Sequence, residues 1–173
     1  KSFIEKCKSN GQIGGIYWTP FTDWARDPER TVDAAPEYKD KDIYLYANGK
    51  PQELDGAYAV DPTHPAVEAM MKKISGLFHR AGFEYVKMDF MTHGAMEADK
   101  WYNPEITTGI QGYNYGMKLL NQYFGDMYIN LSISPVFPAQ YAQSRRIACD
   151  AWNQIKDTEY TLNALSYGWW QKY

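Results

Sequence analysis

Residues 65–90 read PAVEAMMKKISGLFHRAGFEYVKMDF, and this stretch joins a helix to a strand with almost no residues between them. Pro65 suits the first turn of the helix and Gly82 suits its end. Residues 84–90 are rich in β-forming side chains and follow as a strand. A helix that leads directly into a strand is typical of α/β proteins. The helix is indicated by apolar residues at a 3.6-residue period: Val67, Met70, Met71, Ile74, Leu77 and Phe78.

The same alternation continues on both sides of this unit. The pattern predicts a short helix over residues 2–9 and a buried strand over 13–21 before it. After it, the pattern predicts a helix over 110–124, a strand over 127–135, a strand over 147–152 and a helix over 159–170. Strands separated by helix-length segments favour a parallel sheet. About four such units are what an incomplete (β/α)8 TIM barrel would contain, and a doubly wound sheet is the structural alternative.

Residues 22–56 interrupt the alternation. Residues 43–46, followed by Asn48 and Gly49, predict a β-hairpin, because Asn-Gly readily adopts the positive φ angles of a tight turn. The charged residues 37–42 are expected to form a solvated loop. We therefore expect a hairpin insertion near residues 40–55.

Composition excludes several classes of protein. The chain has 173 residues, a net charge of −3 and no concentration of basic residues, which argues against nucleic-acid binding. No apolar run reaches the roughly 18 residues of a membrane span. Two cysteines and three unpaired histidines make neither a disulfide framework nor a zinc site. Aromatic residues make up 16%, which indicates a sugar-binding cleft, although a core accounts for most of them.

Two aspartates follow predicted strands, where barrel enzymes carry their catalytic groups. Asp89 is the first, and strand alternation places it on the same face as Lys87. A neighbouring ammonium group keeps a carboxylate charged, and a charged, positioned carboxylate can act as a covalent nucleophile. A buried structural ion pair is the alternative.

Asp150 is the second of these aspartates, four residues after Arg146. Its neighbours are mostly apolar, and burial favours the protonated form of an acid, which a general acid needs at neutral pH. A cap of a following loop or helix is the alternative. One carboxylate held charged and another held protonated is the combination that a glycosidase uses.

These residues resemble the motifs of the α-galactosidases of glycoside hydrolase clan D, families 27 and 36. In that clan, Lys-x-Asp carries the nucleophile and Arg-x-x-x-Asp carries the acid/base. The matching residues here are Lys87-Met-Asp89 and Arg146-Ile-Ala-Cys-Asp150. The segments Gly15-Ile-Tyr-Trp-Thr-Pro20 and Asp61-Pro-Thr-His-Pro65 are also similar to the family, and the similarity spans nearly the whole chain.

The resemblance implies a retaining hydrolase of terminal α-galactosides, with a carbohydrate substrate and no metal or other cofactor. Asp89 would attack the anomeric carbon. Asp150 would protonate the departing oxygen and then deprotonate the incoming water. Lys87 would bind sugar hydroxyls beside the nucleophile, and Arg146 would bind at the 2-position.

Further substrate contacts are predicted at the strand ends. Trp18 and Trp152 are expected to stack on the sugar, with core packing as the alternative for each. Many relatives carry Glu or Cys at the end of the fifth strand, where this chain has Ser132 and Ser134. We expect Ser134 to contact the sugar. Because small residues there suit an acetamido group, an α-N-acetylgalactosaminidase or another α-glycosidase of the clan is an alternative.

Two functions of other classes stay open at this point. One is a non-catalytic carbohydrate-binding barrel, and the other is a lyase or isomerase that uses Lys87 as a Schiff base. A whole barrel needs roughly 250 residues, so we expect residues 1–173 to be the third to sixth units of one catalytic domain. The remaining barrel and accessory domains would complete it, and residues 1–173 alone would be inactive. The compartment is not decided, with a secreted or periplasmic bacterial protein among the options.

Overall fold

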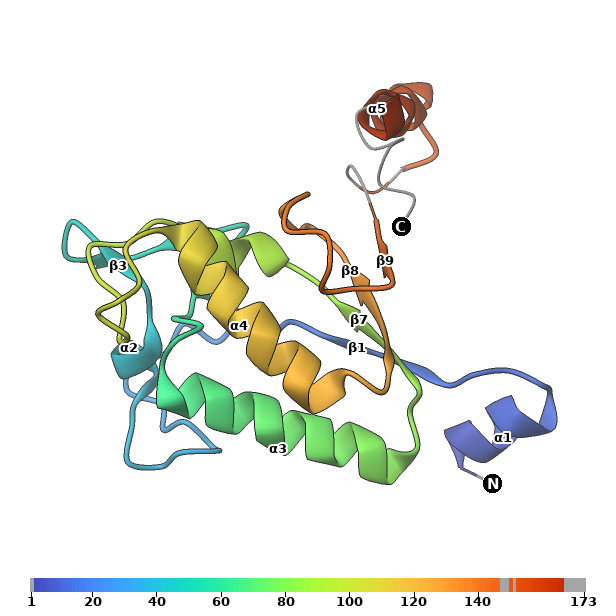
Figure 1. Ribbon diagram of the computed structural model, residues 1–173, viewed down its shortest axis with the longest axis horizontal. Helices are drawn as coiled ribbons and strands as arrows, with labels where there is room; N and C mark the ends of the chain where they lie inside the picture. The colour runs from blue at the N-terminus through green and yellow to red at the C-terminus, as the bar shows by residue number, and fades with distance from the viewer. Residues whose placement is uncertain (1, 147–149, 151, 167–173) are drawn as a thin grey trace.

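The centre of the protein is a parallel sheet, seen in a computed structural model that describes residues 2–146, 150 and 152–166. All three neighbouring strand pairs are parallel. Two helices, α3 (Pro65–Ala81) and α4 (Gly109–Phe124), run along one face of the sheet (Figure 1). The predicted α/β class is therefore confirmed, and the sheet formed by the described residues is open. Its strands lie in the order β1 (Gly15–Trp18), β7 (Tyr85–Met88), β8 (Tyr128–Leu131) and β9 (Ser144–Arg145).

The two long helices begin and end at the residues that the sequence indicates. Before α3, the His64 ring accepts a hydrogen bond from the Ala66 amide at 3.1 Å. Gly82 ends α3 with a φ of 83°, a left-handed conformation that glycine adopts without strain. α4 begins at a capping box formed by Thr108 and Gln111. Each helix connects two neighbouring parallel strands, as a crossover connection requires.

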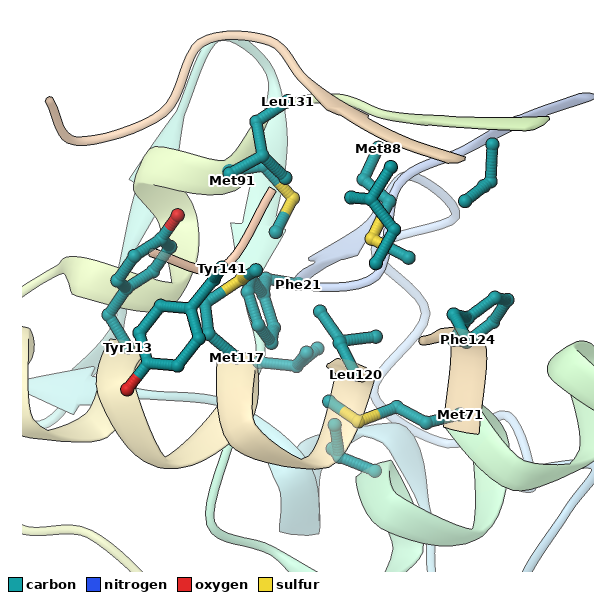
Figure 2. Close-up of a cluster of buried hydrophobic side chains, with 14 of the residues drawn as sticks. Phe21, Met71, Met88, Met91, Tyr113, Met117, Leu120, Phe124, Leu131 and Tyr141 are labelled. Atoms are coloured by element: carbon teal, nitrogen blue, oxygen red, sulfur yellow. The ribbon is translucent and has the colours of Figure 1, made fainter. Parts of the chain in front are cut away.

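The hydrophobic core lies between these helices and the sheet (Figure 2). Phe21, just after β1, packs edge-to-face on Tyr113 of α4, with ring centroids 6.1 Å apart. A Cβ atom at Gly94 or Gly116 would come within 3 Å of the Phe21 ring, so both glycines make room for it. The largest fully buried side chains of the cluster include Phe21, Met71, Met88, Met91, Tyr113, Met117, Leu120, Phe124, Ile129 and Leu131.

The predicted hairpin insertion lies between β1 and α3. The turn at Asn48 and Gly49 has φ angles of 52° and 72°, as an Asn-Gly turn requires. Residues 43–46 are only partly a strand, because Ile43 ends a short helix. The elements of this segment are β2 (Thr22–Asp23), α2 (Asp40–Ile43), β3 (Tyr46–Ala47), β4 (Lys50–Pro51), β5 (Glu53–Leu54) and β6 (Ala57–Ala59), with β2, β6 and β5 forming an antiparallel sheet.

Asp40 is the exception to the solvated loop expected at residues 37–42, in which Glu37, Lys41 and Asp42 are exposed. Asp40 is only 2% exposed. The Arg30 guanidinium bridges Asp40 and Asp23, and the Tyr44 hydroxyl donates to Asp23 at 2.7 Å. Burial raises the pKa of Asp40 more than Arg30 lowers it. The two carboxylates can be buried because the half-exposed Arg30 and the Tyr44 hydroxyl satisfy them, which local sequence does not reveal.

The remaining helices are α1 (Phe3–Ser9), the 3-10 helix η1 (Met91–Ala95) and α5 (Ile155–Ser166). The fourth strand of the sheet is β9, whereas the sequence indicated residues 147–152. Most of that predicted strand, residues 147–149 and 151, lies outside the described residues. The last predicted helix begins four residues earlier than expected, and its predicted end at 167–170 also lies outside the described residues.

A histidine joins the C-terminal ends of α3 and α4. His79 Nε2 lies 2.7 Å from Oδ1 of Asp126, and its Nδ1 lies 2.7 Å from the Ser75 carbonyl oxygen. The hydrogen bond to Asp126 raises the pKa of His79, and the same bond lowers the pKa of Asp126. The pair is therefore fully charged over a limited range of pH.

This pair should make stability depend on pH. Its contribution is largest between about pH 4 and pH 6.5, is lost as pH rises through the raised pKa of His79, and is lost again as pH falls through the lowered pKa of Asp126. Because both side chains are partly exposed, we expect on the order of half a kcal/mol. Urea unfolding of the intact protein and of His79→Gln should differ more at about pH 5.5 than at about pH 8. A difference that does not shrink at the higher pH would contradict this.

Candidate active site

The carboxyl ends of the parallel strands meet at one edge of the sheet. The backbone ladder continues one residue beyond β7, β8 and β9, since the amides of Asp89, Ser132 and Arg146 each donate to a carbonyl on the neighbouring strand at 2.8 to 2.9 Å. These three residues therefore lie at the same level on three adjacent strands. In barrel enzymes this level carries the catalytic groups.

Strand alternation assigns the side chains to two faces of the sheet. One face packs on α3 and α4. The other, which we call the inner face, carries Tyr17, Lys87 and Asn130, which are direct partners across β1, β7 and β8. Asp89 and Ser132 lie on the same inner face, two residues after Lys87 and Asn130 respectively. The sheet thus brings together charged and hydrogen-bonding groups that are far apart in the sequence.

Asp89 is the most tightly held group of the inner face. It is 6% exposed. Its Oδ2 lies 3.3 Å from Nζ of Lys87, and its Oδ1 accepts from the Phe90 amide at 2.9 Å. Burial by itself raises the pKa of Asp89, but the hydrogen bond from the Phe90 amide and the charge of Lys87 outweigh it, so the pKa lies below its ordinary value. The predicted pairing of Asp89 with Lys87 is confirmed, and with its pKa lowered Asp89 is charged at neutral pH.

Two strained turns follow the strands that carry these groups. Phe90 has a φ of 55° and Ile133 a φ of 45°, in the left-handed region where a β-branched residue is rare. Each such residue costs about 1–3 kcal/mol. The turns are joined, because the Thr92 amide and hydroxyl donate to the Ile133 carbonyl at 2.7 and 2.8 Å. The strained backbone turns the chain sharply immediately after Asp89 and Ser132.

Arg145 and His93 brace the loops around this edge, and the sequence did not single out either as a support. Arg145 Nη1 donates to the carbonyls of Pro135 and Val136 at 2.7 and 2.6 Å. His93 is fully buried, and its two ring nitrogens lie 3.0 and 2.8 Å from the carbonyl oxygens of Phe90 and Leu54. His93 therefore ties the turn after Asp89 to the insertion.

Tyr17 is a residue of the inner face that sequence reasoning missed. It is 50% exposed, and Nζ of Lys87 lies 5.5 Å from the centroid of its ring. Burial and the neighbouring Asp89 raise the pKa of Tyr17, with a further increase from Asp150 and a decrease from Arg146. The contact with Lys87 places Tyr17 beside the Lys87–Asp89 pair. Its position across from Lys87 could have been found only by knowing the register of β1 on β7.

The predicted role of Trp18 in sugar stacking is wrong. Its side chain lies on the helix-facing side of β1, where it packs on Phe124 and Phe78 at centroid distances of 5.6 and 6.5 Å. The alternative, core packing, holds. The physical reason is alternation: once Tyr17 faces inward, its neighbour must face the helices.

Arg146 and Asp150 form an ion pair, joined through Nη1 and Oδ1. The Asp150 side chain is 58% exposed. The apolar neighbours expected to bury Asp150, residues 147–149 and 151, lie outside the described residues, so the prediction of a buried general acid stays a prediction. Arg146 Nε is buried and has no hydrogen-bond partner within residues 2–146, 150 and 152–166.

Ser134 and Trp152 are the other predicted substrate contacts. Oγ of Ser134 is buried and has no hydrogen-bond partner in the described part of the chain. A buried hydroxyl without a partner is costly, which favours a partner from elsewhere. Trp152 is 72% exposed, and its amide donates to Asp157 at the start of α5 at 3.1 Å. A contact of either side chain with sugar stays a prediction.

None of the helices formed by the described residues has the length and apolarity needed to cross a membrane. No three His, Cys, Asp or Glu side chains among these residues gather where they could hold a metal ion.

Comparison with known proteins finds similarity at the level of structure. A scan of protein-family models and a search of curated proteins each gave no match. TtGalA, an α-galactosidase from Thermus thermophilus in complex with stachyose, matches with a TM-score of 0.67 and 21% identity, over 92% of this chain and 34% of that chain. The chain therefore spans about a third of the length of TtGalA.

Two further structures match over most of this chain. The glycoside hydrolase domain of PelA from Pseudomonas aeruginosa has a TM-score of 0.62 and 12% identity, over 97% of this chain and 67% of that chain. An α-galactosidase from Lactobacillus brevis has a TM-score of 0.60 and 15% identity, over 95% and 23%. The chain thus has the fold of part of a glycosidase (β/α)8 barrel, and the fold expected from the sequence resemblance is confirmed.

Proposed function

We propose that this chain carries the two catalytic carboxylates of a retaining glycoside hydrolase that cleaves terminal α-galactosides. The observation that carries the proposal is the charged Asp89 carboxylate, fixed at the end of β7 beside Lys87. The Arg146–Asp150 pair follows β9, two strands away along the same sheet. Two carboxylates with different surroundings can divide the roles of nucleophile and acid/base.

In the proposed mechanism, Asp89 attacks the anomeric carbon and forms a glycosyl-enzyme intermediate. Asp150 gives its proton to the departing oxygen and then takes a proton from water, which releases the sugar and Asp89. Each displacement inverts the anomeric carbon, so the configuration is retained overall. Asp150 must carry a proton for the first step, and we propose that Arg146 leaves Asp150 to bind the 2-position of the sugar.

Several features support this proposal over the others. The fold is shared with TtGalA, which has also been solved with p-nitrophenyl α-D-galactopyranoside. Tyr17, Asn130 and Ser132 lie on the same inner face as the nucleophile and carry hydrogen-bonding groups suited to sugar hydroxyls. Because Ser132 and Ser134 are small, an α-N-acetylgalactosaminidase stays within the proposal. The strands that complete the barrel, and any accessory domains, are part of the proposal too.

The test is turnover of p-nitrophenyl α-galactoside by the intact protein, followed by proton NMR. We expect hydrolysis with α-galactose as the first-formed anomer, which then mutarotates. Formation of β-galactose first would overturn the retaining mechanism. Galactoside binding without turnover would favour a carbohydrate-binding barrel, and borohydride trapping of substrate on Lys87 would favour the Schiff-base alternative.

Lys87→Met should shift the acidic limb of the pH–activity profile. Lys87 helps to lower the pKa of Asp89, so its removal raises that pKa. Because only charged Asp89 attacks, we expect the acidic limb of kcat/KM to move up by about one pH unit. Lys72→Met, an exposed lysine of α3, is the matched control and should leave the profile unchanged. An unshifted limb in Lys87→Met would show that Lys87 does not tune Asp89.

A further inference from the structure

Trp24 is an exposed aromatic residue that the proposed mechanism does not use. It follows β2 directly and is 46% exposed. Its indole Nε1 lies 3.2 Å from Oγ1 of Thr19, just beyond the end of β1. Its ring meets Phe90 edge-to-face, with centroids 4.8 Å apart and planes at 78°. Trp24 therefore lies at the carboxyl edge of the sheet, where β1 and β7 end.

This position adjoins the nucleophile. Phe90 follows Asp89, and its amide donates to the Asp89 carboxylate at 2.9 Å. Trp24 thus packs on the residue that directly follows Asp89, the group proposed to attack the anomeric carbon. Because it contacts Phe90, which follows Lys87 along the chain past the end of β7, Trp24 lies further toward the carboxyl edge than Tyr17 and Lys87, the groups proposed to hold the sugar that is attacked.

Trp24 is also held rigidly although it is exposed. The Asp23 carboxylate accepts from the amides of Ala25 and Arg26 at 3.1 and 3.0 Å, which fixes the turn around Trp24. The same carboxylate is bound by Arg30 at 2.6 Å and by Tyr44 at 2.7 Å. A ring held in this way loses little freedom when a ligand packs on it.

The same turn supplies a polar rim. Nη1 of Arg26 lies 2.9 Å from Oε1 of Glu53, and these side chains are 45% and 47% exposed. An exposed flat ring beside charged groups suits a pyranose or an aryl ring, which has apolar faces and, in a sugar, hydroxyl groups at its edge. A cleft of this kind binds the ring by stacking and orients it by hydrogen bonds.

We propose that Trp24 is the stacking platform for the leaving group, meaning the second sugar or the aryl group joined to the departing oxygen. This inference rests on the proposed function. Trp24 binds the leaving group equally in the ground state and in the transition state, so its loss raises KM more than it lowers kcat.

The experiment compares two substrates of the intact protein. Melibiose has a sugar as its leaving group, whereas α-galactosyl fluoride releases fluoride, which offers no ring to stack on. For Trp24→Ala we expect kcat/KM for melibiose to fall roughly tenfold, mainly through KM, and kcat/KM for the fluoride to change less than about twofold. Trp24→Phe keeps a flat ring and should recover most of the loss. Tyr102→Ala removes an aromatic side chain that is 56% exposed and contacts His64, and should affect neither substrate.

The possible outcomes separate this inference from the proposed function. If the unsubstituted protein is active and Trp24→Ala lowers kcat/KM equally for both substrates, or for neither, the role of Trp24 is overturned and the proposed function stands. If Trp24→Ala does not fold, Trp24→Leu is compared with Trp24→Phe. An equal loss of kcat/KM for melibiose in these two variants would also overturn the role of Trp24. An unsubstituted protein that turns over neither substrate overturns the proposed function, and the inference with it.

Discussion

Asp89→Asn should lower kcat for an aryl α-galactoside by on the order of 10⁴-fold or more, since losing a covalent nucleophile removes the reaction pathway itself. Asparagine has nearly the same shape as aspartate, and its side-chain oxygen can still accept from the Phe90 amide. The protein should therefore fold, and its free energy of unfolding should change by less than about 1 kcal/mol. The loss would be chemical, because the uncharged amide cannot attack the anomeric carbon.

Chemical rescue would assign the role more sharply. In Asp89→Gly, azide can enter the space left by the carboxylate and attack the anomeric carbon as the aglycone leaves with a proton. The expected product is β-galactosyl azide, because a single displacement inverts the configuration. Asp126→Asn, on the far side of the helices and paired with His79, is the control and should remain fully active. Activity of Asp89→Asn within tenfold of the unsubstituted protein would remove Asp89 from the mechanism.

Phe21→Ala should have the largest effect on stability. Phe21 is fully buried, and its ring fills the space that Gly94 of η1 and Gly116 of α4 leave open. Truncation of Phe21 leaves a cavity that the backbones of η1 and α4 cannot easily move in to fill. We expect a loss of about 3–5 kcal/mol in the free energy of unfolding.

The measurement is urea unfolding of the intact protein, with Leu77→Ala as the control. Leu77 is 44% exposed on α3, and its truncation should cost less than about 1 kcal/mol. Because η1 follows Asp89 directly, Phe21→Ala should also lower turnover at temperatures where most of the protein is still folded. A cost for Phe21→Ala no greater than that for Leu77→Ala would mean that the space at Gly94 and Gly116 closes.

Much of the fold follows from local sequence. Pro65 and Gly82 mark the ends of α3 that the structure reproduces, and the helix predicted over 110–124 begins one residue earlier, at Gly109. The turn at Asn48 and Gly49 follows from φ angles that these two residue types adopt easily. Such features depend on residues close together in the chain, so short-range patterns were sufficient to predict them.

The site was only partly predictable. Lys87 and Asp89 are two residues apart on one strand, and alternation alone put them on the same face. Trp18 was assigned to the wrong face because Ile16, Tyr17 and Trp18 are all apolar or aromatic, so the sequence of β1 has no polar residue to mark its inner side. The packing of Trp18 on Phe124 shows that Trp18 lies on the helix-facing side of β1.

The alternation of helices and strands, the two ends of α3 and the position of Asp89 at the end of β7 were determined by the sequence itself. Only the tertiary structure decided that Tyr17 faces Lys87, that Asp40 is buried and paired with Arg30, that Asp150 is exposed beside Arg146, and that Trp24 reaches Phe90. The physical reason is that these contacts depend on strand register and on how the insertion packs against the sheet. Both are set by interactions between residues far apart in the chain, which no local pattern records.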